Sequence, residues 1–404
     1  MRRSTVILLT GLMGLCSCST GASAGPLKVY ILAGQSNMQG HAHTRTFDHI
    51  AMDPRTAPLL QAMCSEDGTP RVFDNIWISS LGSAAEVRRG KLTAGYGAAG
   101  RGPKIGPELT FGIYMQKLVD QPILIIKTAW GGKSLHTDFR PPSAGPYQFN
   151  AQQLKRFKER GQDLTQIKEQ RAQGTGHYYR LMIEHIRTVL KDIQQVYPGY
   201  DGAQGYELAG LVWFQGWNDM VDRGTYPNRG RPGGYAQYTE VLAHFIRDVR
   251  KDLAAPSMPF VIGVMGVGGP IDQYGPAEQR YKGIHGGFRQ AMAAPANMPE
   301  FKGNVTAVFT ENYWDPELKK LAAKWELVQG QSRKLNRDKS LTKAQRKTAL
   351  DQFTAEKFTI RELEIYRAGT SNAAYHYLGS AKIMAQIGKA FAEALATTSK
   401  TVNQ

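Results

Sequence analysis

A serine near the start of the chain stands where a nucleophile could work. Ser36 lies in the segment 34–39, Gly-Gln-Ser-Asn-Met-Gln, directly after the apolar run 27–33. That run predicts a buried strand of a parallel sheet. Active sites of open α/β sheets lie just beyond the carboxyl ends of the strands. A hydroxyl in this place can attack an acyl carbon, although a serine here can also simply cap the next helix.

Polar or glycine-rich segments also follow two later strand candidates. Ester hydrolysis by serine needs N–H donors for the oxyanion and an oriented base. Gly131 and Gly132 follow the strand candidate 122–128, and paired glycines let a backbone N–H approach a ligand. Asn218 and Asp219 follow the candidate 208–215. Both segments can also be ordinary turns.

The base should be one of nine histidines. His376 lies in the segment 371–379, just before the last predicted helix. A histidine in a tyrosine-flanked loop is often structural, but its place after the other segments favours His376. His41 and His43 follow the serine closely, and we expect them to be loop residues on the rim of the site.

Taken together, these segments resemble a known family. Gly-Gln-Ser-Asn-Met after an apolar strand resembles the opening block of SGNH-type carbohydrate esterases, and more narrowly the sialate O-acetylesterase / acetylxylan esterase group. It differs from the Gly-x-Ser-x-Gly elbow of α/β-hydrolases because Met38 replaces the second glycine. The resemblance implies that Ser36 is the nucleophile and His376 the base. It assigns the oxyanion and substrate-binding roles to the Ser36 N–H, Gln35, Gly131 or Gly132, and the Asn218 amide.

The chain departs from the family pattern at the acid that orients the histidine. The usual aspartate three residues before the histidine is Ala373 here, and Trp217 stands where many relatives carry glutamate. Three substitutes remain open. We favour Asp219; the others are Glu311 or Asp315, and a Ser–His dyad held by a backbone carbonyl near residues 372–373.

Strand and helix patterns alternate along the chain. Strands are expected at 27–33, 76–80, 122–128, 208–215, 260–264 and 305–309, and helices at 106–119, 178–196, 235–253 and 382–395. This predicts an α/β fold: a three-layer doubly wound parallel sheet of the SGNH hydrolase, flavodoxin-like type. Residues 25–398 are expected to form a single esterase domain with insertions at about 139–176 and 316–367. The first insertion includes a polar helix at 152–173, and the second holds the segment 319–357, which is dense in Lys, Arg, Glu and Gln. Both read as solvated helix faces or as a rim or lid over the substrate.

Residues 1–24 read as a secretory signal peptide. Two arginines precede an apolar run, and Ala22-Ser23-Ala24 offers a cleavage site. A lipoprotein box ending at Cys18 is the alternative, which would anchor the protein through lipid. No later run reaches the length of a membrane span. Cleavage at Ala24 would leave Cys64 as the one cysteine, so stability must come from a packed core.

The formal net charge is +16, or +14 without Arg2 and Arg3. Such a charge suits an anionic glycan, whereas nucleic-acid motifs are missing from the sequence. No metal or organic cofactor is implied. The sequence therefore predicts an exported, periplasmic or extracellular serine esterase that removes O-acetyl groups from a carbohydrate. Trp130 and Trp217 flank the predicted site and could stack on a sugar ring. The alternatives are an inactive glycan-binding homologue, which the missing aspartate at position 373 favours, and an esterase of non-sugar esters. The oligomeric state is left open.

Overall fold

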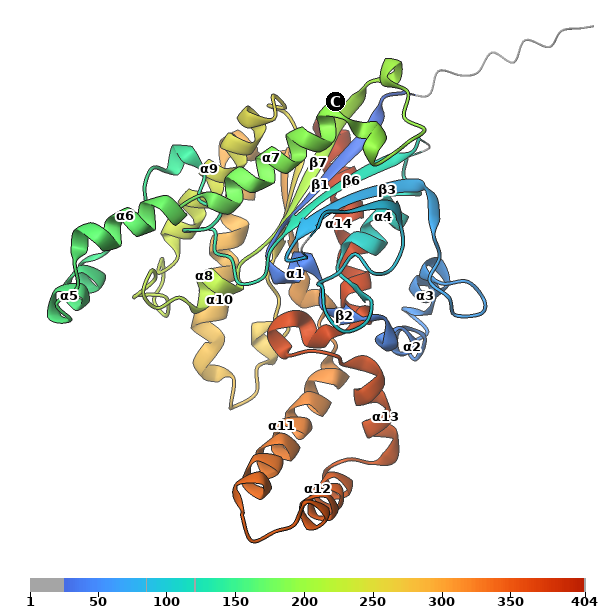
Figure 1. Cartoon of the computed structure of the whole chain (residues 1–404), viewed down its shortest axis with the longest axis vertical. Helices are drawn as coiled ribbons and strands as arrows, with labels where there is room; N and C mark the ends of the chain where they lie inside the picture. The colour runs from blue at the N-terminus through green and yellow to red at the C-terminus, as the bar shows by residue number, and fades with distance from the viewer. Residues whose placement is uncertain (1–24, 85, 120, 403–404) are drawn as a thin grey trace, which may run out of the picture.

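A seven-stranded sheet forms the centre of the molecule. The computed structural model describes residues 25–84, 86–119 and 121–402, and the strand order is β4-β3-β6-β1-β7-β8-β9 (Figure 1). Paired strands are parallel except for edge strand β4, which runs antiparallel to β3. The strands are Leu27–Gly34 (β1), Phe73–Gly82 (β3), Arg88–Leu92 (β4), Ile123–Ala129 (β6), Tyr206–Phe214 (β7), Phe260–Val264 (β8) and Val305–Phe309 (β9). This confirms the predicted parallel sheet. A small second sheet pairs Ala42–His43 (β2) with Lys104–Ile105 (β5).

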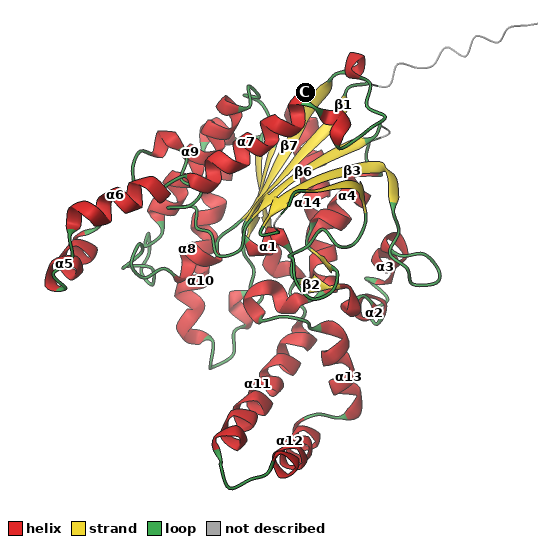
Figure 2. Cartoon of the chain, in the orientation of Figure 1, coloured by secondary structure: helices red, strands yellow, loops and turns green. Residues whose placement is uncertain are grey.

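Helices cover both faces of the sheet, as three layers require (Figure 2). One face carries His177–Lys191 (α7), Ala236–Asp252 (α9) and Gln279–Ala293 (α10); the other carries Glu108–Gln116 (α4) and Ala381–Val402 (α14). Successive side chains of β7 serve the two faces: Trp213 packs on Phe245 of α9, and Phe214 on Phe391 of α14. With both faces covered, β6 is buried along its whole length.

The two insertions lie outside the sheet. The first contains Ala151–Glu159 (α5) and Leu164–Gly174 (α6). The predicted single helix at 152–173 is wrong because Gly161 has a φ of +62° and Asp163 caps a new helix, accepting from the Thr165 N–H at 2.8 Å.

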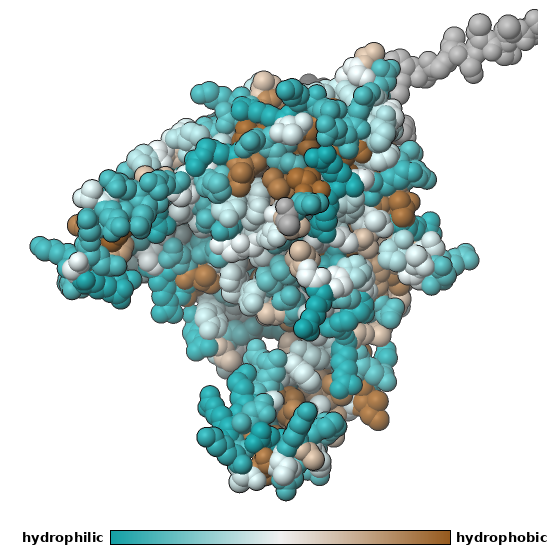
Figure 3. All heavy atoms as spheres, viewed as in Figure 1, coloured by the Kyte–Doolittle hydropathy of each residue, from teal (hydrophilic) through white to brown (hydrophobic). Residues whose placement is uncertain are grey.

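The second insertion contains Pro316–Arg337 (α11), Lys343–Lys357 (α12) and Ile360–Gly369 (α13). The charge-dense segment 319–357 spans α11 and α12, and Thr342 starts α12 with a capping box. No residue of α12 is buried, and hydrophilic side chains cover most of this end of the molecule (Figure 3). The charged segment therefore lies outside the sheet core, as its composition predicts.

Four short helices complete the fold: Ser36–Gln39 (α1), Asp48–Ala51 (α2), Ala57–Met63 (α3) and Trp217–Val221 (α8). Cys64, at the end of α3, is a buried free thiol. The predicted leader and Cys18 lie outside the described residues. Within the described ranges, no helix is both long and apolar enough to span a membrane.

Candidate active site

Sheet register brings the predicted segments to one place. Gly34, the last residue of β1, pairs with Ala129 of β6 on one side and with Phe214 of β7 on the other. The residues that follow these three positions must therefore meet at the same edge of the sheet. Gly34 also allows the close approach, because a Cβ there would lie 2.2 Å from the Phe214 carbonyl oxygen.

A cavity of about 520 Å³ opens at this edge. Five predicted site residues line it together: Ser36, Gly131, Gly132, Asn218 and His376. Seven further residues complete the lining: Gln39, His41, Ser83, Ala98, Ala99, Trp217 and Tyr375. The residue types that acyl transfer needs are thus gathered around one hollow, although they come from distant parts of the chain.

Ser36 is the first residue of α1 and does not cap it. The N-cap position is Gln35, and no side chain caps this helix. The Ser36 hydroxyl is nearly buried and donates to Gln35 Oε1 at 3.1 Å. Gln35 is itself buried beside the serine and does not line the cavity, so its contact is with the nucleophile candidate.

The glycine pair lies directly beside this serine. A Cβ built on Gly131 would be 3.8 Å from Ser36 Cβ. Gly132 has a φ of +76°, which side chains other than glycine rarely adopt. These features let the backbone turn tightly next to the hydroxyl, where an N–H donor for an oxyanion is needed.

His376 is held in a tightly closed loop. Its N–H donates to the Ala373 carbonyl at 2.9 Å. The next two residues, Tyr377 and Leu378, have φ values of +52° and +61°, conformations that cost energy and persist only under strong local constraint. Tyr377 supplies the constraint: it is fully buried, and its hydroxyl bonds Thr310 Oγ1 at 2.6 Å and accepts the Gly266 N–H at 2.8 Å.

Asn372, and not a carboxylate, contacts the ring of His376. Asn372 Oδ1 lies 3.0 Å from His376 Nδ1 and also accepts the Ala373 N–H at 2.8 Å. The backbone donor identifies this atom as oxygen, so Nδ1 must carry the proton that it donates. The lone pair of His376 is then on Nε2, the atom that a general base would use.

The three expected partners of His376 are therefore wrong. Asp219 bonds elsewhere, Glu311 pairs with Arg289, and Asp315 caps α11 and pairs with Lys382. The dyad alternative comes closest, but a side-chain amide replaces the expected backbone carbonyl. Loop geometry explains this outcome, because the turn closed by the bond from the His376 N–H to the Ala373 carbonyl brings the ring back to Asn372.

Asp219 instead ties together the two loops that line the cavity. Its buried carboxylate accepts the N–H groups of Leu135 and His136 at 2.8 and 3.0 Å, Gln215 Nε2 at 2.6 Å and the Tyr226 hydroxyl at 3.3 Å. Burial raises its pKa to about 6 against the opposing effect of these donors. The carboxylate thereby fixes the segment after Gly132 relative to α8, which carries Asn218.

A buried ion pair holds the backbone beside the cavity in place. Lys127 of β6 pairs with Glu108 at 2.7 Å, and both side chains are almost completely buried. The lysine also donates to the carbonyl oxygens of Gln39 and Tyr96 at 2.9 and 3.0 Å. It therefore holds the end of the turn that begins with Ser36.

The tryptophans have different environments. Trp217 lines the cavity beside Tyr375, with ring centroids 5.6 Å apart. Trp130 is buried and packs against Phe139 and Tyr178, so of the two tryptophans only Trp217 can offer a face to a sugar. His43 lies outside the cavity lining, whereas His41 lines it and stacks on His376.

Sequence reasoning missed several lining residues. Gln39 could have been found, because it follows Ser36 by three residues in a helical turn and so shares its face. Ser83 follows β3, whose last residue Gly82 pairs with Ala129, but no local pattern marks it. In the described residues no three His, Cys, Asp or Glu side chains group as metal ligands.

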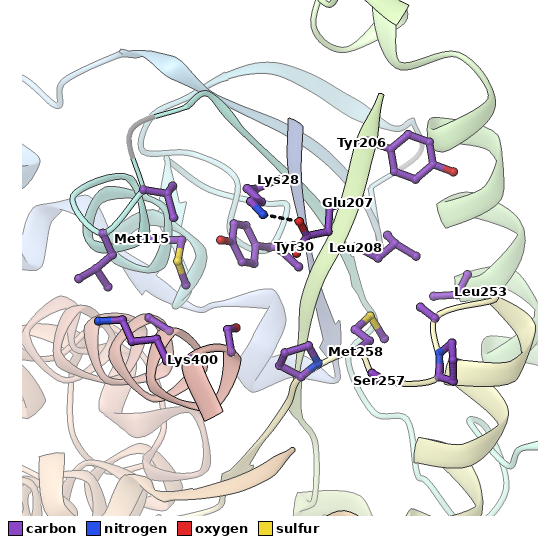
Figure 4. Close-up of a pocket in the computed structure, with 18 of the residues that line it drawn as sticks. Lys28, Tyr30, Met115, Tyr206, Glu207, Leu208, Leu253, Ser257, Met258 and Lys400 are labelled. Atoms are coloured by element: carbon purple, nitrogen blue, oxygen red, sulfur yellow. Dashed lines mark hydrogen bonds and ion pairs between the residues drawn. The ribbon is translucent and has the colours of Figure 1, made fainter. Parts of the chain in front are cut away.

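A larger cavity, of about 690 Å³, lies at the opposite edge of the sheet (Figure 4). It is formed by the first residues of β1 and β7 and the end of α14, and the Lys28–Glu207 ion pair lies on its wall. No histidine lines it. Its residues therefore lack a base for acyl transfer, and the smaller cavity is the candidate active site.

Comparisons with known proteins identify the family of the chain. The family model described as "Carbohydrate esterase, sialic acid-specific acetylesterase" matches residues 26–284. A search of curated proteins found no match. Among solved structures, an Arabidopsis thaliana protein aligns with a TM-score of 0.37 and 17% identity, over 70% of this chain and 86% of that one. A carbohydrate acetylesterase from Xanthomonas citri aligns with a TM-score of 0.36 and 13% identity, over 70% and 49%.

The fold is the three-layer α/β fold of SGNH hydrolases, and the chain is a carboxylic ester hydrolase. It belongs to the carbohydrate esterase, sialic acid-specific acetylesterase family, whose model covers more than half of its length.

Proposed function

We propose that this protein is a serine O-acetylesterase that deacetylates a carbohydrate through an acyl-enzyme intermediate. The observation that carries the proposal is the convergence of Ser36, the Gly131–Gly132 turn, Asn218 and His376 on one cavity. Nucleophile, oxyanion donors and base are the three elements that ester hydrolysis by serine requires.

In this mechanism the Ser36 hydroxyl turns from Gln35 toward His376 and attacks the acetyl carbon. His376 Nε2 takes the hydroxyl proton and returns it to the departing sugar oxygen, leaving an acetyl-serine. Water then attacks the ester with the same histidine as base, and acetate leaves. The N–H groups of Ser36 and Gly132 and the side-chain amide of Asn218 would hold the oxyanion in both halves.

The substrate proposal rests on shape and charge. Trp217 and Tyr375 place aromatic side chains on the wall of the cavity, where a sugar ring could stack on them. Net charge of +16 favours an anionic glycan near the surface. We expect purified protein to release acetate from acetylated glycans, most from uronic- or sialic-acid-containing ones, while Ser36→Ala releases none. No release from any member of a broad panel would contradict the proposal.

A second candidate is a glycan-binding protein without catalysis. One observation favours it: the partner of His376 is an amide and not a carboxylate. Glycan binding measured by calorimetry, with no acetate released over long incubation, would support this alternative. Acetate release that depends on Ser36 would exclude it.

We also propose that the chain is exported and that residues 25–398 form one esterase domain carrying both insertions. The support is the leader pattern of residues 1–24. N-terminal sequencing of the protein from a bacterial envelope fraction should begin at Gly25; a lipid-modified Cys18 would favour the lipoprotein alternative.

A further inference from the structure

Two imidazoles lie stacked in the cavity. The rings of His41 and His376 are parallel within 1°, with centroids 3.9 Å apart. Tyr375 contacts the same His376 ring from another direction, at 4.4 Å and an angle of 66°. The ring of His376 is thus confined by two aromatic side chains and by its bond to Asn372. Nothing in the proposed mechanism yet uses His41.

The stack is built into the fold by contacts between its two segments. Ser371 Oγ accepts the His43 N–H at 3.1 Å and donates to the Gly379 carbonyl at 2.7 Å. Arg45 adds a second link, donating to the Thr370 carbonyl at 2.6 Å. The chain after Ser36 and the loop of His376 therefore move as one unit, which keeps the rings in register.

His41 is a neutral ring in this position. Its Nε2 is buried and has no hydrogen-bond partner among the described residues, whereas an imidazolium needs two acceptors. Burial and the nearby charges of Lys104 and Lys127 lower its pKa to about 4. A second proton on His41 is thus disfavoured by solvation, by charge and by geometry.

We propose that His41 is a positioning residue for the esterase reaction, presenting a neutral aromatic face that holds the His376 ring and stabilises its protonated form. This inference rests on the proposed function. When the Ser36 O–H bond breaks, its proton forms a bond to His376 Nε2, and the ring becomes a cation directly over His41. A cation over an aromatic face is stabilised, more so when both are shielded from water. The stack supplies part of what an aspartate gives in a triad.

Two substitutions of His41 distinguish the effect of its aromatic face from the effect of its volume. His41→Phe keeps a face and His41→Leu does not, while both keep the site buried; His177→Leu, at an exposed position, is the control. We expect His41→Phe to stay within about 3-fold of the parent kcat, and His41→Leu to lose roughly 3- to 30-fold with KM little changed. The acid limb of kcat/KM should lie at lower pH in His41→Leu than in His41→Phe, because the imidazolium has lost its aromatic partner. The parent is not the reference for this limb, since His41 itself takes a proton near pH 4 and its charge then lowers the pKa of His376. If the leucine variant does not fold, His41→Met replaces it.

Equal kcat in the parent and His41→Leu would overturn the proposal, as would acid limbs at the same pH in His41→Leu and His41→Phe. A phenylalanine variant as poor as the leucine variant would also overturn it, since the imidazole nitrogens would then matter and not the face. If the parent hydrolyses no acetate ester, the proposed function is wrong, but the proposal about His41 can still be tested. The stack is then tested without substrate, by NMR titration of the His376 ring: a lower pKa in His41→Leu than in His41→Phe supports it, and equal values refute it.

Discussion

Converting Asn372 to aspartate should strengthen the base at His376. Asn372 Oδ1 already lies 3.0 Å from Nδ1, so Asn372→Asp places a carboxylate where a triad acid would be, with little change in shape. A charge of opposite sign at this distance raises a histidine pKa by about 1 to 3 units. Burial lowers the pKa of His376 to about 3 in the parent protein, so the variant ring stays neutral, and able to accept a proton, at pH 7.

The sign of the effect follows from this shift. A raised pKa means that the imidazolium is stabilised, so activity is lost at a higher pH as the solution becomes acidic. The acid limb of kcat/KM should move up by about 1 to 3 units, and kcat at pH 7 should rise because the base is stronger. Asn372→Leu should do the reverse: the Nδ1–H of the half-buried ring loses its acceptor, at a cost of about 0.5 to 1.5 kcal/mol. That cost lowers kcat roughly 2- to 12-fold.

The assay is the pH profile of aryl acetate hydrolysis for the parent and both variants. Asn336→Asp adds the same charge on an exposed part of α11 and serves as the control. An acid limb that stays in place in Asn372→Asp, or a leucine variant with the parent kcat, would refute the claim that Asn372 orients His376.

Three further predictions concern the surroundings of the site. Asp219→Asn should lower kcat with KM little changed and should lower the melting temperature, because its NH2 group would face the backbone N–H donors of Leu135 and His136. Exposed Asp74→Asn is the control. Equal effects of the two substitutions would argue against the claim that Asp219 fixes the segment after Gly132 relative to α8. Lys127→Met should lower the free energy of unfolding, measured in urea, by about 3 to 5 kcal/mol, because Glu108 is then buried without a partner. Adding Glu108→Gln should restore part of this stability. A Lys127→Met variant as stable as the parent would contradict the prediction. The melting temperature should fall between pH 6.5 and 4, because the unfolded chain binds protons there that five histidines with lowered folded-state pKa values do not: His41, His136, His185, His285 and His376. Asp219, whose pKa is raised to about 6, acts in the opposite direction and offsets this fall only in part. A flat profile would contradict the assignment of the five rings as neutral.

The sheet was predictable because its strands are continuous apolar runs. β1 and β6 are buried on both faces, and such strands need no polar alternation. Edge strand β4 was not predictable, since Arg88–Leu92 contains mostly polar residues and pairs only along one side. The break between α5 and α6 depends on a single glycine and a cap, which a polar stretch conceals.

The site was predictable to the level of its segments and no further. Residues that follow strand ends could be placed at one edge, so Ser36, Gly132 and Asn218 were found. The partner of His376 was missed because it depends on the turn between Asn372 and His376, and the residues between them, Ala373 to Tyr375, carry no turn signal. The role of Asp219 was missed because its donors come from a loop that is distant in sequence.

Labelling with a fluorophosphonate tests directly whether Ser36 is an activated nucleophile. An activated serine displaces fluoride from such a probe and keeps the phosphonyl group, so mass spectrometry identifies the residue. If Ser36 is the nucleophile, one adduct forms, on the peptide that contains Ser36, and acetate release falls as the adduct accumulates; Ser36→Ala forms no adduct. An adduct at another residue, or a Ser36→Ala variant that hydrolyses acetate esters as fast as the parent, would contradict this assignment.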